Sequence, residues 1–196
     1  MAFGKNVNNA KKFVCPWWMG YLLINPFRRL VQDPRKILHG LVSEGMTVLE
    51  PGPGMGYFTI ELARLVGASG RVVAVDVQQK MIDEMLRRAG EAGVAGRIQG
   101  RLADGTSICA VDLNGSVDFV LAFAMVHELP DPELFFEEAY RCLKPGGRML
   151  LAEPNGHVRK GAFEKELIHA TAAGFTSGGE QKIWRSHAVL LLKREE

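Results

Sequence analysis

The sequence predicts one α/β domain built on a doubly wound, mostly parallel sheet in three layers. Short apolar runs alternate along the chain with amphipathic segments of helical spacing, and turn-forming residues separate them. The runs are continuously apolar rather than alternating, which is typical of parallel strands covered on both faces. Repeated strand–helix units imply right-handed crossovers, and such sheets bind ligands at the carboxyl ends of their strands.

Length and composition agree with a single globular domain. The chain has 196 residues, of which 47% are hydrophobic and 23% charged. A net charge of +2 is too small to indicate a nucleic acid or a membrane as partner. The cysteines, Cys15, Cys109 and Cys142, are far apart and lack metal-ligand spacing, so no metal is expected. Without a recognisable signal peptide, we expect a cytoplasmic protein.

Each element of the first half has a local signal. Asp33 followed by Pro34 is typical of a helix start, because aspartate caps free N–H groups and proline suits the first turn. Gly67–Gly70 is a turn, and the apolar run after it ends at Asp76. The expected elements are a helix from Pro34 to about Leu41 or Val42, a strand Thr47–Glu50, a helix Tyr57–Val66, a strand Arg71–Asp76, a helix from about Gln79 to Ala92, and a strand around Ile98–Leu102.

The second half continues the alternation and then changes character. Asn114-Gly115-Ser116 is a turn, Pro130-Asp131-Pro132 begins a helix, and Lys144-Pro145-Gly146-Gly147 ends it. The expected elements are a strand Val117–Phe123, that helix, a strand Arg148–Ala152 and a helix at about Arg159–Ala173. Two closing strands are then suggested by Gly174-Phe175, Gly178-Gly179, Ile183–Arg185 and Ala188–Leu192.

The stretch from Glu50 to Gly56 joins the first strand to its helix and carries glycine at 52, 54 and 56. Glycine tolerates positive φ and lets a ligand lie against the backbone, while the helix start offers free N–H groups. The dinucleotide pattern needs its third glycine where Tyr57 stands. A carboxylate at Glu50 repels a pyrophosphate and suits a cationic ligand. A tight turn without a ligand is the alternative.

This acidic-x-Gly-x-Gly-x-Gly pattern resembles the first motif of the class I S-adenosylmethionine (SAM)-dependent methyltransferases, in particular small-molecule, methyltransferase-11-like members. Further matches follow in order: Asp76 at the second strand end, Leu102–Gly105, Phe119–Leu129 and Leu143–Leu151. The resemblance covers roughly residues 37 to 193. It implies a seven-stranded Rossmann-like sheet of order 3-2-1-4-5-7-6, with the last strand antiparallel. It also implies a SAM-binding domain over residues 37–196 behind a helical N-terminal cap or lid over residues 1–36.

The resemblance assigns SAM as cofactor, with S-adenosylhomocysteine as product, and implies its binding residues. In the family, the acidic residue at Asp76 holds both ribose hydroxyls and the turn at Asp104 takes the adenine amine. Capping of a helix by Asp76 and a plain turn at Asp104-Gly105 remain alternatives. The implied cofactor set is Glu50, Gly52, Gly54, Gly56, Asp76, Val77, Ala103, Asp104, Gly105 and Phe123.

Methyl transfer from a sulfonium is an in-line displacement that needs alignment and exclusion of water, so no catalytic constellation is obligatory. His127 is the candidate for accepting a proton or orienting the acceptor. The aromatic N-terminal segment is the candidate roof, although its tryptophans also suit plain packing on the sheet. The candidate substrate residues are Cys15, Trp17, Trp18, Tyr21, Glu128, Glu153 and His157.

We expect a small-molecule acceptor and a monomer or homodimer. The loop Ala124–His127 lacks the Asn/Asp-Pro-Pro-Tyr pattern of relatives that methylate amino nitrogens of DNA, so DNA is not expected as a partner. No segment is long and apolar enough to span a membrane. Two alternatives remain: a SAM-binding module without turnover, and an NAD-dependent oxidoreductase on the same kind of sheet.

Overall fold

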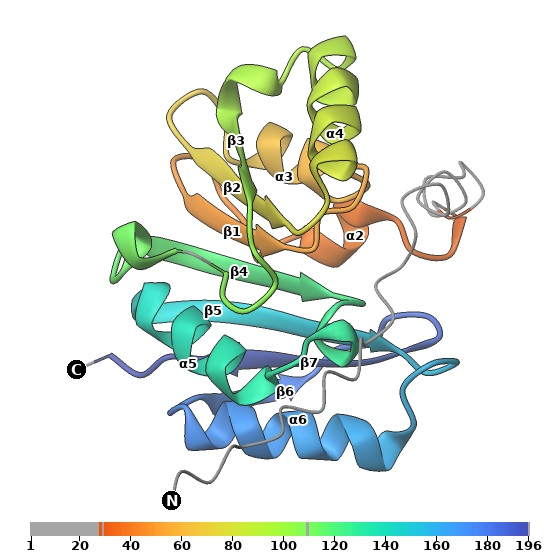
Figure 1. Ribbon diagram of the computed structural model, residues 1–196, viewed down its shortest axis with the longest axis vertical. Helices are drawn as coiled ribbons and strands as arrows, with labels where there is room; N and C mark the ends of the chain where they lie inside the picture. The colour runs from red at the N-terminus through yellow and green to blue at the C-terminus, as the bar shows by residue number, and fades with distance from the viewer. Residues whose placement is uncertain (1–27, 29, 109, 196) are drawn as a thin grey trace, which may run out of the picture.

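The computed structural model describes residues 28, 30–108 and 110–195. One seven-stranded sheet, in the order β3-β2-β1-β4-β5-β7-β6, runs through the molecule (Figure 1). The first five strands pair in parallel, whereas β7 is antiparallel to β5 and β6 is antiparallel to β7. The predicted order and the antiparallel end of the sheet are confirmed. The strands are β1 Thr47–Pro51, β2 Arg71–Asp76, β3 Ile98–Leu102, β4 Val117–Phe123, β5 Leu143–Pro154, β6 Thr176–Glu180 and β7 Ser186–Leu192.

The helices cover the sheet on two faces. Because successive strand residues point to opposite faces, Val48 packs with α2 and α3 whereas the next residue, Leu49, packs in the core that contains α5 and α6. The helix α4 lies beside α3 (Figure 1). The three-layer prediction is therefore confirmed. The helices are α2 Pro34–Leu38, α3 Thr59–Leu65, α4 Gln79–Glu91, α5 Pro132–Cys142 and α6 Lys160–Ala172.

Helix starts follow the capping signals. The Asp33 carboxylate accepts the backbone N–H of Arg35 at 3.0 Å, and Asp131 accepts that of Leu134 at 3.0 Å. The first of these helices ends at Leu38, before the expected position, and the chain turns at Gly40, where φ is +72°. Of the predicted N-terminal cap, residues 28 and 30–36 are described. That part contains the start of α2.

Two strand assignments near the end of the sheet differ most from the sequence prediction. The strand β5 begins at Leu143 rather than Arg148, because Leu143 pairs with Val117 before the register shifts and Arg148 pairs with Phe119. The Lys144–Gly147 stretch thus interrupts the ladder without ending the strand. The Ile183–Arg185 stretch was expected in a closing strand, but it lies in the connection between β6 and β7, where Arg185 has φ +52°. A residue with positive φ suits a turn rather than a strand.

Within the described ranges, no helix combines the length and apolar character needed to cross a bilayer.

Candidate functional site

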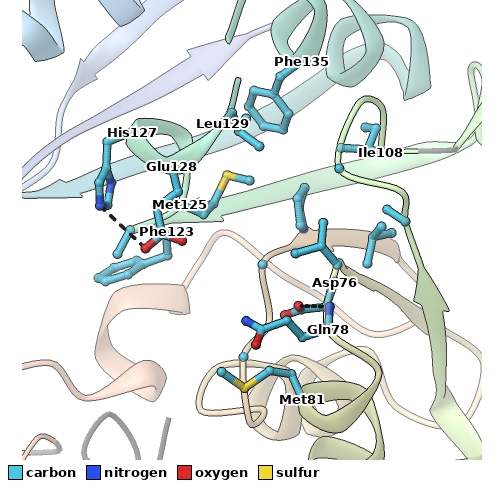
Figure 2. A pocket seen from close by; sticks show the side chains of 18 of the residues that line it. Asp76, Gln78, Met81, Ile108, Phe123, Met125, His127, Glu128, Leu129 and Phe135 are labelled. Atoms are coloured by element: carbon cyan, nitrogen blue, oxygen red, sulfur yellow. Dashed lines mark hydrogen bonds and ion pairs between the residues drawn. The ribbon is translucent and has the colours of Figure 1, made fainter. Parts of the chain in front are cut away.

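A cavity of about 440 Å³ lies at the carboxyl ends of the parallel strands. Its lining comes from the ends of β1 to β5 and the loops that follow them, from α4 and α5, and from the segment before α2. Figure 2 shows Asp76, Gln78 and Met81 on one side of the cavity and Phe123 and His127 on the other. The lining also includes residues from the predicted cofactor and substrate sets, namely Gly52, Gly54, Val77, Ala103, Gly105, Glu128 and His157.

The loop after β1 brings bare backbone to the cavity. At Gly52 φ is +67°, and a Cβ there would lie 2.9 Å from the Cβ of Met125, so only glycine allows this close approach. At Gly54 φ is +53°, and a Cβ would meet nothing within 4 Å, because this backbone faces open space. Gly56 belongs to the same turn but does not line the cavity; its missing Cβ makes room for Met85 of α4. Gly52 thus allows close packing against Met125, Gly54 presents bare backbone to the cavity, and Gly56 makes room for α4.

Asp76 ends β2 and contributes a carboxyl group to the cavity. Its side chain accepts the backbone N–H of Gln78 at 2.9 Å (Figure 2). Burial raises the pKa of Asp76 to about 6, the backbone N–H groups of Gln78, Gly54 and Val77 oppose the rise, and Glu128 across the cavity adds to it. The glycine loop and the next strand end therefore act on the same carboxyl group.

Glu50 lies behind the cavity wall rather than on it. Its side chain is buried, and within the described residues its Oε2 has no hydrogen-bond partner. Burial raises the pKa of Glu50 to about 8; the hydroxyl of Thr59 opposes the rise and the Asp76 carboxyl adds to it. A positive charge in the adjoining cavity would stabilise the ionised form of this carboxyl. The site therefore fits a cationic ligand better than an anionic one.

The turn after β3 lines the cavity with Ala103, Gly105 and Thr106, but Asp104 is exposed and does not line it. The Asp104 carboxylate accepts the backbone N–H of Thr106 at 2.8 Å and its hydroxyl at 2.7 Å. These bonds hold the pKa of Asp104 below its ordinary value. The structure places this carboxylate on its own turn, and its predicted role toward adenine stays a prediction.

Glu138 of α5 is a cavity residue that the sequence analysis missed. Its carboxylate accepts the hydroxyl of Ser107 at 2.5 Å and the backbone N–H of Ile108 at 2.9 Å, and all three residues line the cavity. The sequence contains one signal for this role. Glu138 follows Phe135 by three positions, so a carboxylate stands on the apolar stripe of the helix.

His127 follows β4 and meets the end of β5. Its Nδ1 lies 2.5 Å from Oε2 of Glu153, a side chain with 0% exposure, while Oε1 of Glu153 accepts the backbone N–H of Val126 at 2.7 Å. His157 lies near, with its ring centroid 6.0 Å from that of His127. His127 and His157 line the cavity, whereas Glu153 lies behind its wall.

The segment before α2 closes one side of the cavity with Arg28 and Gln32, which sequence reasoning did not single out. The Arg28 guanidinium lies 4.3 Å from the centroid of the Tyr57 ring, and its Nε donates to Oε1 of Gln32 at 3.0 Å. The Tyr57 hydroxyl donates to the backbone oxygen of Gln32 at 2.8 Å. The predicted lid residues Cys15, Trp17, Trp18 and Tyr21 lie outside the described residues.

No group of three His, Cys, Asp or Glu side chains in the part of the chain described by the structure is placed to hold a metal ion. Cys142 is the last residue of α5, and its buried thiol donates to the backbone oxygen of Ala110 at 3.4 Å. Burial raises the pKa of this thiol to about 11, so it stays protonated near neutral pH.

A family model and a solved structure both match this chain to methyltransferases. A family model described as "Methyltransferase domain" matches residues 42–190. A solved SAM-dependent methyltransferase from Aquifex aeolicus aligns with a TM-score of 0.80 and 25% identity, over 91% of this chain and 99% of that one.

Two curated relatives match over a shorter length. An arsenite methyltransferase from Aquipseudomonas alcaligenes is 35% identical over 117 residues, which is 56% of this chain and 33% of the relative. A ubiquinone/menaquinone biosynthesis C-methyltransferase, UbiE, from Klebsiella pneumoniae is 30% identical over 112 residues, which is 57% of this chain and 44% of the relative. The matched part thus spans less than half of each curated relative.

Proposed function

We propose that this chain, which belongs to the class I SAM-dependent methyltransferases, transfers a methyl group from its cofactor SAM to a small-molecule acceptor. The observation that carries the proposal is the pairing of bare backbone at Gly54 with two buried acidic side chains, Glu50 and Asp76. Bare backbone admits a ligand at close range, and the carboxyl groups favour one with positive charge. A sulfonium nucleoside with an ammonium group meets both conditions.

The residues that would hold the cofactor follow the strand ends. Backbone at Gly52 and Gly54 would lie against the methionine part, and the Asp76 carboxylate would accept the ribose hydroxyls. Ala103 and Gly105 would border the adenine. Glu50 would act through its charge from behind the wall, since it does not line the cavity.

When bound, SAM supplies a methyl group on a sulfonium, which transfers by in-line displacement. The chain's own part is to align the acceptor and to exclude water. Met125, Leu129 and Phe135 provide apolar wall for this purpose, and Phe123 lines the cavity beside Arg28, with its ring centroid 5.8 Å from the guanidinium. His127, Glu128 and His157 supply the polar groups on the same lining.

A small acceptor is supported by the size of the cavity and by the relatives. A volume of about 440 Å³ is in the range of roughly 300–1,000 Å³ common for small-ligand sites. The named curated relatives, an arsenite methyltransferase and a quinone-biosynthesis C-methyltransferase, also act on small molecules. We propose that the residues 1–36 segment contributes to the roof, because Arg28 and Gln32 already line the cavity.

Calorimetric titration with SAM, S-adenosylhomocysteine and NADH tests the cofactor. We expect micromolar-range binding of the two sulfur nucleosides and none of NADH; the reverse preference would support an NAD-dependent oxidoreductase instead. Turnover is tested by incubating the protein with SAM and a metabolite panel and measuring S-adenosylhomocysteine by mass spectrometry. Binding without product on any acceptor would indicate a module without turnover.

A further inference from the structure

We propose that Glu153 and His127 form a carboxylate–imidazole pair that removes a hydroxyl proton from the acceptor. This inference rests on the proposed function and deepens it, because it names the acceptor class. The acceptor carries an ionisable hydroxyl group whose loss of a proton activates the atom to be methylated. Thiolates and metalloids, which need no base, are not the expected acceptors. In this pair His127 is the catalytic residue and Glu153 the positioning residue.

The buried side of the imidazole is fixed at two points. Glu153 lies at the end of β5. Its Oε2 lies 2.5 Å from Nδ1 of His127, and its Oε1 accepts the backbone N–H of Val126 at 2.7 Å. Both oxygens thus bind one short segment, the turn Val126–Glu128. A carboxylate at Nδ1 stabilises the tautomer that carries its proton there. The lone pair of the neutral ring is then on Nε2.

The opposite side of the ring is on the cavity side. Nε2 of His127 lies 4.0 Å from Oε1 of Glu128, and both residues line the cavity (Figure 2). The same cavity is lined by Gly52, Gly54 and Asp76, where the cofactor is proposed to bind. A base directed into this space is within the same enclosure as the methyl donor. A proton-accepting role requires a base that borders the space where the acceptor binds, and His127 meets this condition.

Charged groups from several elements surround the imidazole. Glu153 of β5, Glu128 of the same turn and Glu166 of α6 raise the pKa of His127, while burial opposes the rise. The largest cause is the hydrogen bond that the imidazole makes with the Glu153 carboxylate, which accepts it. His157, in the loop after β5, faces the ring at 6.0 Å. A raised pKa makes the neutral ring a stronger base, but it reduces the fraction of His127 that is neutral at low pH. Activity should therefore rise with pH through this pKa.

In the proposed step, a proton passes from the acceptor to His127. The acceptor's O–H bond breaks and its proton goes to Nε2 of His127. The released electron pair forms the new bond to the methyl carbon, either from oxygen or from a ring carbon conjugated with it. When a ring carbon is methylated, its C–H bond then breaks and the proton returns to the oxygen. The carbon–sulfur bond breaks with its electrons remaining on sulfur, and the imidazolium returns its proton to water. No oxidant, reductant or metal is needed.

A titration of the free protein tests the pair without cofactor. Imidazole resonances are followed by NMR against pH, with His127→Asn used for assignment. We expect a pKa above that of an ordinary histidine and the tautomer protonated at Nδ1. Glu153→Gln removes the negative charge and should lower this pKa toward that of an ordinary histidine, because the largest cause of the rise is lost. Glu153→Asp, which keeps the charge, should retain most of the rise.

The matched control is Glu164→Gln, an exposed carboxylate on the helix that carries Glu166. This control should leave the His127 titration unchanged. If Glu153→Gln leaves it unchanged as well, while circular dichroism shows the native fold, the pair does not set the basicity of the ring and the proposal is wrong.

Turnover with a panel of phenols and enols supplies the second readout. The wild-type kcat/KM should rise to a plateau with an inflection at the pKa measured by NMR, and Glu153→Gln should move both together to lower pH. His127→Asn should reduce kcat by about 10²-fold or more with SAM affinity retained. Equal turnover of a hydroxyl acceptor by wild type and His127→Asn would overturn the proposal.

A rate that falls with pH through the same pKa would overturn it too, because the imidazolium would then be the required form. Preferred turnover of arsenite or a thiol over every hydroxyl acceptor would also refute the acceptor class. If the wild-type protein does not bind SAM, the proposed function is refuted instead. The NMR result would be untouched by that outcome, so the two failures are distinguishable.

Discussion

Replacing the buried Glu50 by glutamine should stabilise the free protein at neutral pH. The glutamate side chain is 3% exposed, and burial raises its pKa from an ordinary 4.5 to about 8. Between these values the folded chain holds a proton that the unfolded chain releases. The wild-type free energy of unfolding should therefore fall as pH rises through this window, and Glu50→Gln should not share that loss.

The magnitude follows from the size of the shift. Each pKa unit corresponds to about 1.36 kcal/mol, so the roughly 2.5 units between the ordinary pKa and pH 7 correspond to about 3 kcal/mol. For a chain of this length, one kcal/mol moves the melting temperature by about 2–4 °C. We expect Glu50→Gln to melt roughly 6–12 °C above wild type at pH 7 and close to wild type near pH 4.5.

Thermal unfolding followed by circular dichroism at pH 5, 6, 7 and 8 measures this difference. The matched control is Glu137→Gln, which neutralises an exposed carboxylate on α5. It should follow the wild-type curve at every pH. If Glu50→Gln and wild type also stay parallel from pH 5 to 8, Glu50 does not hold a proton in the folded protein and the electrostatic reasoning fails.

Three further substitutions test the cofactor site and its glycine loop. Asp76→Ala should weaken SAM binding by about 1–3 kcal/mol in calorimetry, the scale of losing charge-assisted hydrogen bonds. Asp104→Ala should cost less, because that carboxylate is exposed and bound to its own turn; an equal loss would restore its direct contact with adenine. Gly52→Ala should reduce the free energy of unfolding by about 1–3 kcal/mol, since φ is +67° and the new Cβ would meet Met125 at 2.9 Å. Gly161→Ala, in open space on α6, is its control and should be neutral or stabilising in urea unfolding.

Strand positions could be predicted where local and global signals agree. The bounds of β2 and β4 are those expected, because a glycine-containing turn precedes each of these mainly apolar runs. The start of β5 could not be predicted, because Pro145 and two glycines are typical of a stop. Only the pairing of Leu143 with Val117 across the sheet overrides that signal.

Site residues close to the motifs could be predicted, but long-range partners could not. Asp76 and Phe123 line the cavity because strand ends converge in any sheet of this topology. Arg28 and Glu138 reach the same cavity only through the packing of a rim segment and a helix onto the loops. The position of Glu138 on the apolar stripe of its helix is a signal in the sequence, but nothing in the sequence shows which loops that helix or the rim segment contacts.

The two acidic side chains of the cofactor site act as one unit in the free protein. Glu50 and Asp76 are both buried, and each has a pKa raised above its ordinary value, Glu50 to about 8 and Asp76 to about 6. The Asp76 carboxyl contributes to the rise at Glu50, so ionising one makes ionising the other harder. A bound cation would relieve both costs at once, whereas a bound pyrophosphate would add to them. The free-energy cost of ionising these buried carboxyl groups in the free protein is therefore what would favour a positively charged sulfur nucleoside as ligand. Binding of that ligand near pH 7 should release protons from the two groups.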